Sequence, residues 1–387
     1  VEPDKPFSGN FNVRIPPQLH REITILSSSE GTSLNSIVQQ ALEHHIAATK
    51  RQIPLSYQFM ENELKMNIRK ISVVNANVDL QSALRFVAVF AGAKFALYSA
   101  FQTLIDPGEE VLVPVPYWVS YAEQITLAQG VPVFVETSEE NVFKLTVDLL
   151  EKALTNKTKL LILNSPSNPT GLTYSREELY EISQWALNHQ VFVIADEIYY
   201  ELVHDVSSIS VASLSEEIQN NTLVINGLSK SVAMTGWRLG YAFGPVEVIL
   251  ALNDLTSHTT SNPAAVVQFA AIRAFQEDLQ EDKEAMRLQF QKRIELFHAL
   301  IQEIPGMSCV KPGGAFYLFV NIQEAMKIVG VETSDAFALK LLEEVGVATV
   351  SGENFGCTGY LRLSCSSSEE ELKNAAQRMN QFVRNYL

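Results

Sequence analysis

The stretch INGLSKSVAMTGWRLGY, residues 225–241, places a single lysine, Lys230, between two serines. The apolar run TLVING (222–227) leads into it, and a second run, RLGYAF (238–243), leads out of it. Short apolar runs that are rich in β-branched residues are typical of buried strands. The stretch therefore predicts two strands, with Lys230 at the point where the first one ends.

Similar runs occur through the middle of the chain, and helical stretches separate several of them. The runs are EVLVPV (110–115), VPVFVE (131–136), KLLILN (159–164) and VFVIADE (191–197), and the helical stretches lie near 117–128, 147–155 and 175–189. Apolar strands that alternate with helices predict a mostly parallel sheet covered on both faces. We therefore expect an α/β large domain over residues 89–280.

The chain after this region predicts a smaller α+β domain, residues 281–387. A long charged helix, roughly 279–303, leads into it. We expect strands near 315–320, 346–350 and 360–364, and helices near 333–345 and 368–385.

The N-terminal residues 1–50 read as a separate unit. In GNFNVRIP the apolar residues alternate with polar ones, which is the period of a strand. Two helical segments follow, separated at Gly31, and Ser33 can cap the second one. Residues 51–88 show no clean period and are assigned as a junction.

Composition narrows the class of protein. A chain of 387 residues with 47% hydrophobic residues can bury more than one core, and its formal charge of −15 argues against a broad nucleic-acid-binding surface. The three cysteines form neither a CxxC pair nor a zinc spacing, so we expect no metal site. No apolar run reaches the roughly 18 residues that span a bilayer, so we expect a soluble, cytoplasmic protein.

Polar residues gather where the predicted parallel strands end. Asn168 follows KLLILN, Asp196 closes VFVIAD, and Lys230 follows TLVING. Ligands bind at the carboxyl ends of the strands in such sheets. Together with Tyr199 and Arg238, these residues predict one pocket.

The motifs SPSNPTG, DEIY and SKSVAMTGWRLGY resemble those of the class I/II aminotransferases, which have the pyridoxal-phosphate fold type I. PGEEVLVPVPYWVSY and SHTTSNP are similar to the aspartate aminotransferase branch. The resemblance runs from about residue 91 to the C-terminus. It implies a pyridoxal 5′-phosphate cofactor and transfer of an amino group between an amino acid, such as aspartate or glutamate, and a 2-oxo acid.

The resemblance also implies roles for individual residues. Lys230 would form the Schiff base with the cofactor and then move a proton, because a lysine amine reacts in its neutral form. Asp196 would pair with the pyridine nitrogen, and Asn168 and Tyr199 would bond the phenolic oxygen. Trp118 would stack on the ring.

The remaining implied roles concern the phosphate and the substrate. Free N–H groups at a helix start suit an anion, and Arg362 would grip the substrate carboxylate with two hydrogen bonds, near Trp118 and Asn168. The expected phosphate-binding residues are Gly92, Ala93, Lys94, Ser229 and Arg238.

Each role has a structural alternative. Lys230 and Lys94 could be surface charges, Asp196 a helix cap, Trp118 a core residue and Arg362 a solvated strand residue. The chain also reads FVAVFAGAK (86–94) where the family has a polar strand end, and the N-terminal unit stands in place of the family's usual leading segment. The resemblance therefore supports cofactor binding more directly than turnover.

The N-terminal unit resembles a ribbon-helix-helix domain of the Arc and HicB type, through NFNVRIPPQLH (10–20) and GTSLNSIVQQAL (31–42). The resemblance implies strand pairing between two chains and directs Asn10, Asn12 and Arg14 toward DNA bases. The alternative is an exposed face of a strand that serves only to dimerise.

We therefore interpret the chain as an aminotransferase, expected to be a homodimer, with a ribbon-helix-helix unit at its N-terminus. Two other interpretations stay open. One is a DNA-binding regulator whose aminotransferase-like part binds cofactor or amino acid without turnover, and the other is an inactive fusion.

Overall fold

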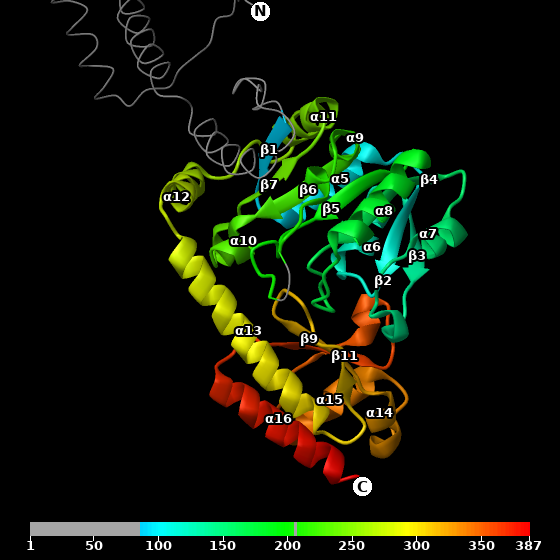
Figure 1. Ribbon diagram of the computed structural model, residues 1–387, viewed down its shortest axis with the longest axis vertical. Coiled ribbons are helices and arrows are strands. Elements are labelled where there is room, and N and C mark those ends of the chain that lie inside the picture. The colour runs from blue at the N-terminus through cyan, green and yellow to red at the C-terminus, as the bar shows by residue number, and fades with distance from the viewer. Residues whose placement is uncertain (1–85, 205–206) are drawn as a thin grey trace, which may run out of the picture. The chain divides into compact units, whose positions relative to one another are not determined.

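The computed structural model describes residues 86–204 and 207–387, which belong to one compact unit (Figure 1). The predicted ribbon-helix-helix unit, residues 1–50, and most of the predicted junction lie outside the described residues. No helix in the described ranges is long and apolar enough to cross a membrane.

A mixed, mostly parallel seven-stranded sheet forms the larger part, as the sequence predicts. Its strands are β1 (Val87–Phe90), β2 (Glu110–Val115), β3 (Val131–Glu136), β4 (Thr158–Asn164), β5 (Phe192–Asp196), β6 (Thr222–Gly227) and β7 (Gly240–Phe243). They lie in the order β1-β7-β6-β5-β4-β2-β3. The strands from β6 to β3 are parallel, whereas β7 and β1 pair antiparallel.

Helices cover both faces of this sheet, because alternate residues of each buried strand are apolar on opposite sides. One core contains side chains of α5 (Ala93–Leu104), α6 (Ser120–Leu127) and α11 (Val246–Ser257). The opposite core contains those of α7 (Val147–Ala153), α8 (Arg176–Asn188) and α9 (Glu216–Asn220). Ser175 and Glu178 start α8 with a reciprocal capping box.

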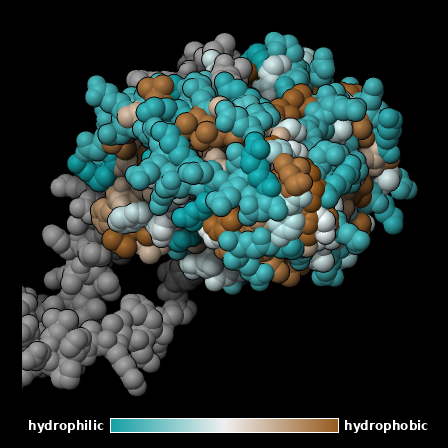
Figure 2. Space-filling view, turned by 90° about the horizontal axis from the view of Figure 1, so that it is seen from below, coloured by the Kyte–Doolittle hydropathy of each residue, from teal (hydrophilic) through white to brown (hydrophobic). Residues whose placement is uncertain are grey.

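The smaller part is an antiparallel sheet with its own apolar core. Its strands β8 (Ser308–Cys309), β9 (Tyr317–Asn321), β10 (Val350–Ser351) and β11 (Tyr360–Ser364) lie in the order β10-β11-β9-β8. The helices α13 (Gln280–Gln302), α14 (Gln323–Val329), α15 (Ser334–Val345) and α16 (Glu369–Arg384) pack against it. Seen from this end, the surface is mostly hydrophilic, with apolar side chains in small separate groups (Figure 2).

The long helix α13 links the two sheets, and α12 (Ala265–Gln276) precedes it (Figure 1). Both sheets lie within the same compact unit, so the boundary that we predict at residue 280 stays a prediction.

Some elements differ from the sequence-based expectation. Strand β1 begins at Val87, within the predicted junction. Only the start of α5 was expected, through the resemblance, although its buried residues Ala93, Ala96, Leu97, Ala100 and Phe101 recur at helical spacing. The strand expected near 346–350 is reduced to β10, because α15 ends at Gly346 with a left-handed φ of 65°. Arg238 also lies outside β7, on the loop before it.

Candidate active site

The carboxyl ends of β4, β5 and β6 bring the predicted polar residues together. Asn164 and Asp196 are register partners at the ends of β4 and β5, and β6 runs directly into α10 (Leu228–Ser231), which carries Lys230. One pocket forms at this edge. Its lining comprises Ala93, Lys94, Leu97, Trp118, Tyr121, Asn164, Asn168, Asp196, Ile198, Tyr199, Ser229, Lys230, Thr235, Arg238, Tyr317 and Arg362.

Asp196 is a buried carboxylate, only 4% exposed. The Tyr121 hydroxyl donates to its Oδ2 at 2.6 Å, and the backbone N–H of Ile198 donates to its Oδ1 at 3.2 Å. Burial raises the pKa of Asp196 to about 6, although both hydrogen bonds oppose this rise. The carboxylate is therefore a strong acceptor for a buried cationic N–H.

Lys230 is half-buried on the aromatic side of the pocket. Its Nζ lies 5.1 Å from the centre of the Phe316 ring and 5.8 Å from that of Tyr199. Burial lowers the pKa of Lys230, and the nearby guanidinium groups of Arg362 and Arg238 lower it further. The environment thus shifts Lys230 toward the neutral, nucleophilic amine, and its half-buried position in the pocket does not fit a solvated surface lysine.

Arg362 of β11 reaches the pocket from the small sheet. It donates to Oδ1 of Asn168 at 3.0 Å, and its guanidinium carbon lies 4.6 Å from the Tyr317 ring centre and 5.0 Å from that of Phe355. The Nε of Arg362 is buried and has no hydrogen-bond partner in the described part of the chain. An uncompensated cation with a free donor suits a carboxylate ligand.

Tyr199 is also buried, and its hydroxyl lies 3.0 Å from that of Tyr317. Burial and the neighbouring Tyr317 raise the pKa of Tyr199 well above its ordinary value, so the phenol stays protonated.

The N-terminus of α5 also lines the pocket, through Ala93 and Lys94. Gly92 precedes the helix with a φ of 93°, and its own N–H donates to the Phe90 carbonyl at 2.7 Å. The first N–H groups of a helix have no acceptor within the helix, so those of Ala93 and Lys94 are available to an anion, whereas that of Gly92 is not.

Close approach of the backbone shapes this helix start. A Cβ at Gly240 would collide with the backbone of Gly92 and Ala93, and a Cβ at Gly92 would collide with the Arg238 guanidinium. The exposed Arg238 therefore lies beside the start of α5, where its Nη1 also donates to the Thr235 carbonyl at 2.9 Å.

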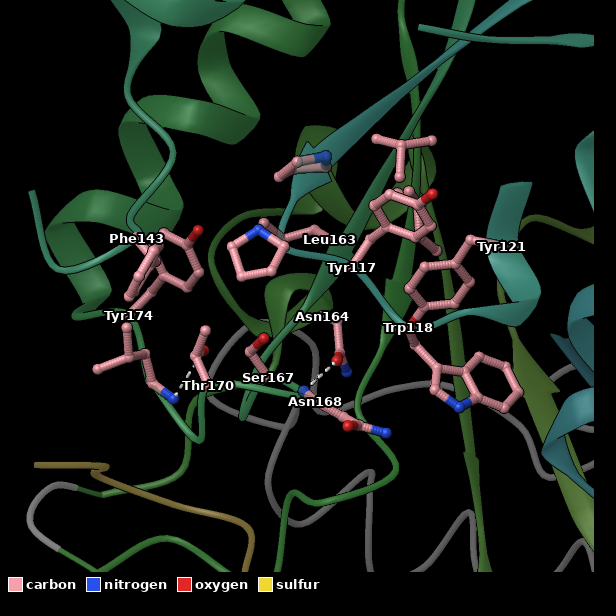
Figure 3. Close-up of a pocket in the computed structure, with 15 residues that line it drawn as sticks. Tyr117, Trp118, Tyr121, Phe143, Leu163, Asn164, Ser167, Asn168, Thr170 and Tyr174 are labelled. Atoms are coloured by element: carbon pink, nitrogen blue, oxygen red, sulfur yellow. Dashed lines mark hydrogen bonds between the residues drawn. The ribbon is translucent and has the colours of Figure 1, made fainter. Parts of the chain in front are cut away.

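Asn164 ties the loop that carries Asn168 to the strand that carries Asp196. Its Nδ2 donates to the Asp196 carbonyl at 2.8 Å, and its Oδ1 accepts the Asn168 N–H at 2.8 Å. Figure 3 shows this pair in an adjoining recess, between the aromatic group of Tyr117, Trp118 and Tyr121 and the rings of Phe143 and Tyr174.

Trp118 forms part of the wall of both cavities. Its ring meets the Tyr121 ring edge-on, with centres 5.3 Å apart and planes at 76°. The Lys94 ammonium lies 4.8 Å from the Trp118 ring centre. Trp118 is therefore a half-buried pocket wall and not a residue of the deep core.

The structure brings the predicted pocket residues to one site, with Gly92 adjoining it through Arg238. The predicted DNA-contacting residues, Asn10, Asn12 and Arg14, lie outside the described residues. Sequence reasoning missed Tyr121, Asn164 and Tyr317. Tyr121 closes the motif PGEEVLVPVPYWVSY and Asn164 closes the apolar run KLLILN, but no local pattern marks their side chains as reaching the pocket.

The donor set fits an elongated ligand with three different ends. It offers a buried carboxylate for a protonated ring nitrogen, a helix start with Arg238 and Ser229 for a multiply charged anion, and an amine whose pKa is lowered for a carbonyl carbon. These are the groups of pyridoxal phosphate, so the residues present fit the cofactor that the sequence resemblance implies.

Comparisons with known proteins agree with this geometry. Residues 25–379 match the family described as aminotransferase class I and II, and residues 1–42 match the HicB family. An aspartate aminotransferase of Geobacillus stearothermophilus is 47% identical over 321 residues, covering 83% of this chain and 81% of that protein. An asparagine–oxo-acid transaminase of Streptococcus mutans is 46% identical over 298 residues, covering 77% of this chain and 76% of the relative.

Solved structures show the same fold. The aspartate aminotransferase of Thermus thermophilus, solved with maleate, superposes with a TM-score of 0.76 at 35% identity and covers 84% of this chain and 81% of that one. The family matches confirm the resemblance to the class I/II aminotransferases and to the HicB family, whereas the ribbon-helix-helix fold of residues 1–50 stays a prediction.

Proposed function

The chain belongs to the class I and II aminotransferases, and on that premise we propose that it moves the amino group of aspartate or glutamate to a 2-oxo acid. The observation that carries this proposal is the meeting of Lys230, Asp196 and Arg362 in one pocket. An amine, a buried carboxylate and a free guanidinium are the three groups needed to hold a carbonyl cofactor and the carboxylate of an amino acid.

The proposed cofactor contacts follow the polarity of the pocket. Asp196 would hold the proton on the ring nitrogen, and Asn168 and Tyr199 would bond the phenolic oxygen. The N–H groups of Ala93 and Lys94, with Ser229 and Arg238, would take the phosphate. When bound, pyridoxal phosphate supplies an aldehyde that links to amines and a ring that withdraws electrons from the substrate α-carbon.

Lys230 has two proposed tasks that both need a neutral amine. It would hold the cofactor covalently until an amino acid replaces it, and it would then carry a proton at the substrate α-carbon. The lowered pKa of Lys230 supports both tasks, because a protonated amine can neither attack a carbonyl nor accept a proton.

The choice of a dicarboxylic substrate rests on the remaining cation of the pocket lining. Lys230, Arg238 and Arg362 have tasks above, which leaves the Lys94 ammonium, exposed at the pocket wall over Trp118, for a second carboxylate. The relative named for aspartate and the Thermus structure with maleate also support a short dicarboxylic substrate.

A coupled assay with aspartate and 2-oxoglutarate tests this function. We expect the full chain with added cofactor to form oxaloacetate, Lys230→Ala to lose this activity, and the exposed control Lys327→Ala to keep it. A wild-type chain that binds cofactor but forms no product would contradict the proposal and favour a sensor that binds without turnover.

We propose, second, that residues 1–42 bind DNA, because they match the HicB family. Acidic residues outnumber lysine and arginine within residues 1–50, so we expect weak phosphate contact and a marked dependence on base sequence. A mobility-shift assay with fragments of the source genome checks this. Binding should be lost in Arg14→Ala, and the absence of any shifted fragment would refute it.

We also propose that the chain acts as a homodimer. Leu250 of α11 and Val266 and Phe269 of α12 are 54%, 66% and 55% exposed, which leaves apolar surface for a partner. Light scattering at working concentration should give twice the chain mass of 43.1 kDa, and a monomer mass would contradict the proposal.

A further inference from the structure

A short hydrogen bond joins two elements beneath the pocket. The hydroxyl of Tyr121, on α6, donates to Oδ2 of Asp196 at 2.6 Å, across 75 residues of sequence. The two side chains are 2% and 4% exposed. A hydroxyl–carboxylate distance of this length is typical of a charge-assisted hydrogen bond, which is stronger than one between neutral groups.

The Tyr121 hydroxyl stays protonated, and several other polar groups surround its acceptor, Asp196. Burial and Asp196 raise the pKa of Tyr121 well above its ordinary value, so Tyr121 is a donor at every working pH. Around the Asp196 carboxylate, the described residues offer the Ile198 N–H, the Tyr199 phenol and the cations that line the same pocket, namely Lys94, Lys230, Arg238 and Arg362.

Burial and hydrogen bonding oppose each other at Asp196. Burial favours the neutral acid, whereas the Tyr121 hydroxyl and the Ile198 N–H favour the ionised form. Tyr121 supplies the larger of these two favourable contributions, so its hydroxyl is the main group that opposes protonation of the carboxylate in the cofactor-free pocket.

We propose that Tyr121 is a positioning residue, which holds Asp196 ionised and oriented to receive the protonated ring nitrogen of the cofactor. This inference rests on the proposed function, because the ring nitrogen belongs to the cofactor. Tyr121 itself acts through Asp196.

The ring of Tyr121 has a separate task, which allows the hydroxyl to be tested alone. Its edge-on contact with Trp118 is a contact between the two rings, so Tyr121→Phe keeps the ring and removes the hydrogen bond. Tyr174→Phe is the matched control. Tyr174 is also buried, but its hydroxyl accepts the Leu145 N–H at 3.0 Å.

The experiment measures the dissociation constant of pyridoxal phosphate from pH 5.5 to 9 for the wild type and both variants. We expect affinity of the wild type to fall as pH drops through the titration of Asp196. In Tyr121→Phe this fall should begin about one pH unit higher, with a loss of about twofold near pH 7 that approaches about tenfold toward pH 5.5 and little loss at pH 9. Tyr174→Phe should keep the wild-type profile.

An equal loss at every pH, or an unchanged profile, would overturn the inference, because a packing role alone does not depend on the charge of Asp196. The carboxyl titration of the cofactor-free protein, followed by infrared spectroscopy and assigned with Asp196→Asn, gives an independent readout. It should shift upward in Tyr121→Phe even if the chain has no aminotransferase activity. Activity with an unshifted titration would instead refute the role of Tyr121 and leave the proposed function intact.

Discussion

At the scale of single residues, burial in the pocket disfavours the ionised form of Asp196, the form that we propose binds the cofactor. The pKa of Asp196 in the folded protein is about 6, compared with an ordinary value of 3.8. Between these values the folded state binds more protons than the unfolded state, so the free energy of unfolding falls as pH rises from about 4 to about 6. The ionised Asp196 thus lowers the free energy of unfolding at neutral pH, and the same charge is the anion that the site presents to the cofactor.

Asp196→Asn should therefore stabilise the cofactor-free protein at pH 7.5. The gain in the free energy of unfolding should approach about 3 kcal/mol and vanish near pH 4, because the amide has no charge to bury. Urea denaturation at the two pH values measures it. The same variant should bind pyridoxal phosphate more weakly. An equal effect of the substitution at both pH values would show that the carboxylate charge is not responsible.

Lys94→Ala should separate substrates by charge. We expect KM for aspartate to rise about tenfold, which corresponds to loss of one exposed charge-assisted contact, while KM for alanine changes little. Steady-state kinetics with both amino acids check this, with Lys327→Ala as the control. If both KM values rise equally, the ammonium serves the phosphate or the fold and not the distal carboxylate.

At the scale of elements, the phosphate end of the pocket depends on how closely β7 passes the start of α5. Gly240 has no room for a side chain, because an added Cβ would meet the backbone of Gly92 and Ala93. Backbone atoms cannot move aside as the end of a flexible side chain can. The strand therefore sets the position of the helix N–H groups that we propose for the phosphate.

Gly240→Ala should lower the free energy of unfolding by about 1–3 kcal/mol and weaken cofactor binding. Gly236→Ala is the control, since an added Cβ there meets no atom within 4 Å, and its effect on stability should stay within about 0.5 kcal/mol. Thermal and urea denaturation, with a cofactor titration, distinguish the two. Equal behaviour of the two variants would contradict the close approach.

The sequence predicts those elements and residues whose signals are local. Asp196 closes an apolar run, and Lys230 and Asn168 lie within four residues of the end of one, so the parallel-sheet rule alone places them at one edge. Tyr121 and Tyr317 reach the site through hydrogen bonds that span 75 and 118 residues, and no local pattern encodes such contacts. Only the start of helix α5 was expected, through the resemblance, although its buried residues Ala96, Leu97, Ala100 and Phe101 recur at helical spacing.

At the scale of the molecule, the two sheets meet at the pocket through polar contacts. Arg362 of the small sheet bonds Asn168 of the large one, and Glu139 accepts hydrogen bonds from Asn321 at 2.6 Å and Tyr360 at 2.9 Å. Glu139 begins a short 3-10 helix (Glu139–Asn141) after β3, whereas its two partners lie on β9 and β11. A change in the position of the small sheet relative to the large one would therefore move Arg362 relative to Lys230.

Glu139→Ala should weaken the contact between the two sheets. We expect the free energy of unfolding to fall by about 1–3 kcal/mol, because two donors lose their shared acceptor, and KM for the amino acid to rise. The exposed neighbour Glu140→Ala serves as the control and should change neither quantity. If Glu139→Ala leaves both the free energy of unfolding and KM unchanged, other contacts hold the small sheet in position.

The most direct test of the whole account is to find which lysine holds the cofactor. The purified full chain is treated with pyridoxal phosphate and borohydride, which fixes the linkage, and its peptides are then mapped by mass spectrometry. The account predicts a single pyridoxyl-phosphate mass on the peptide that contains Lys230, and none there in Lys230→Ala. A mark that falls on exposed lysines instead, with Lys230 unmodified, would contradict it.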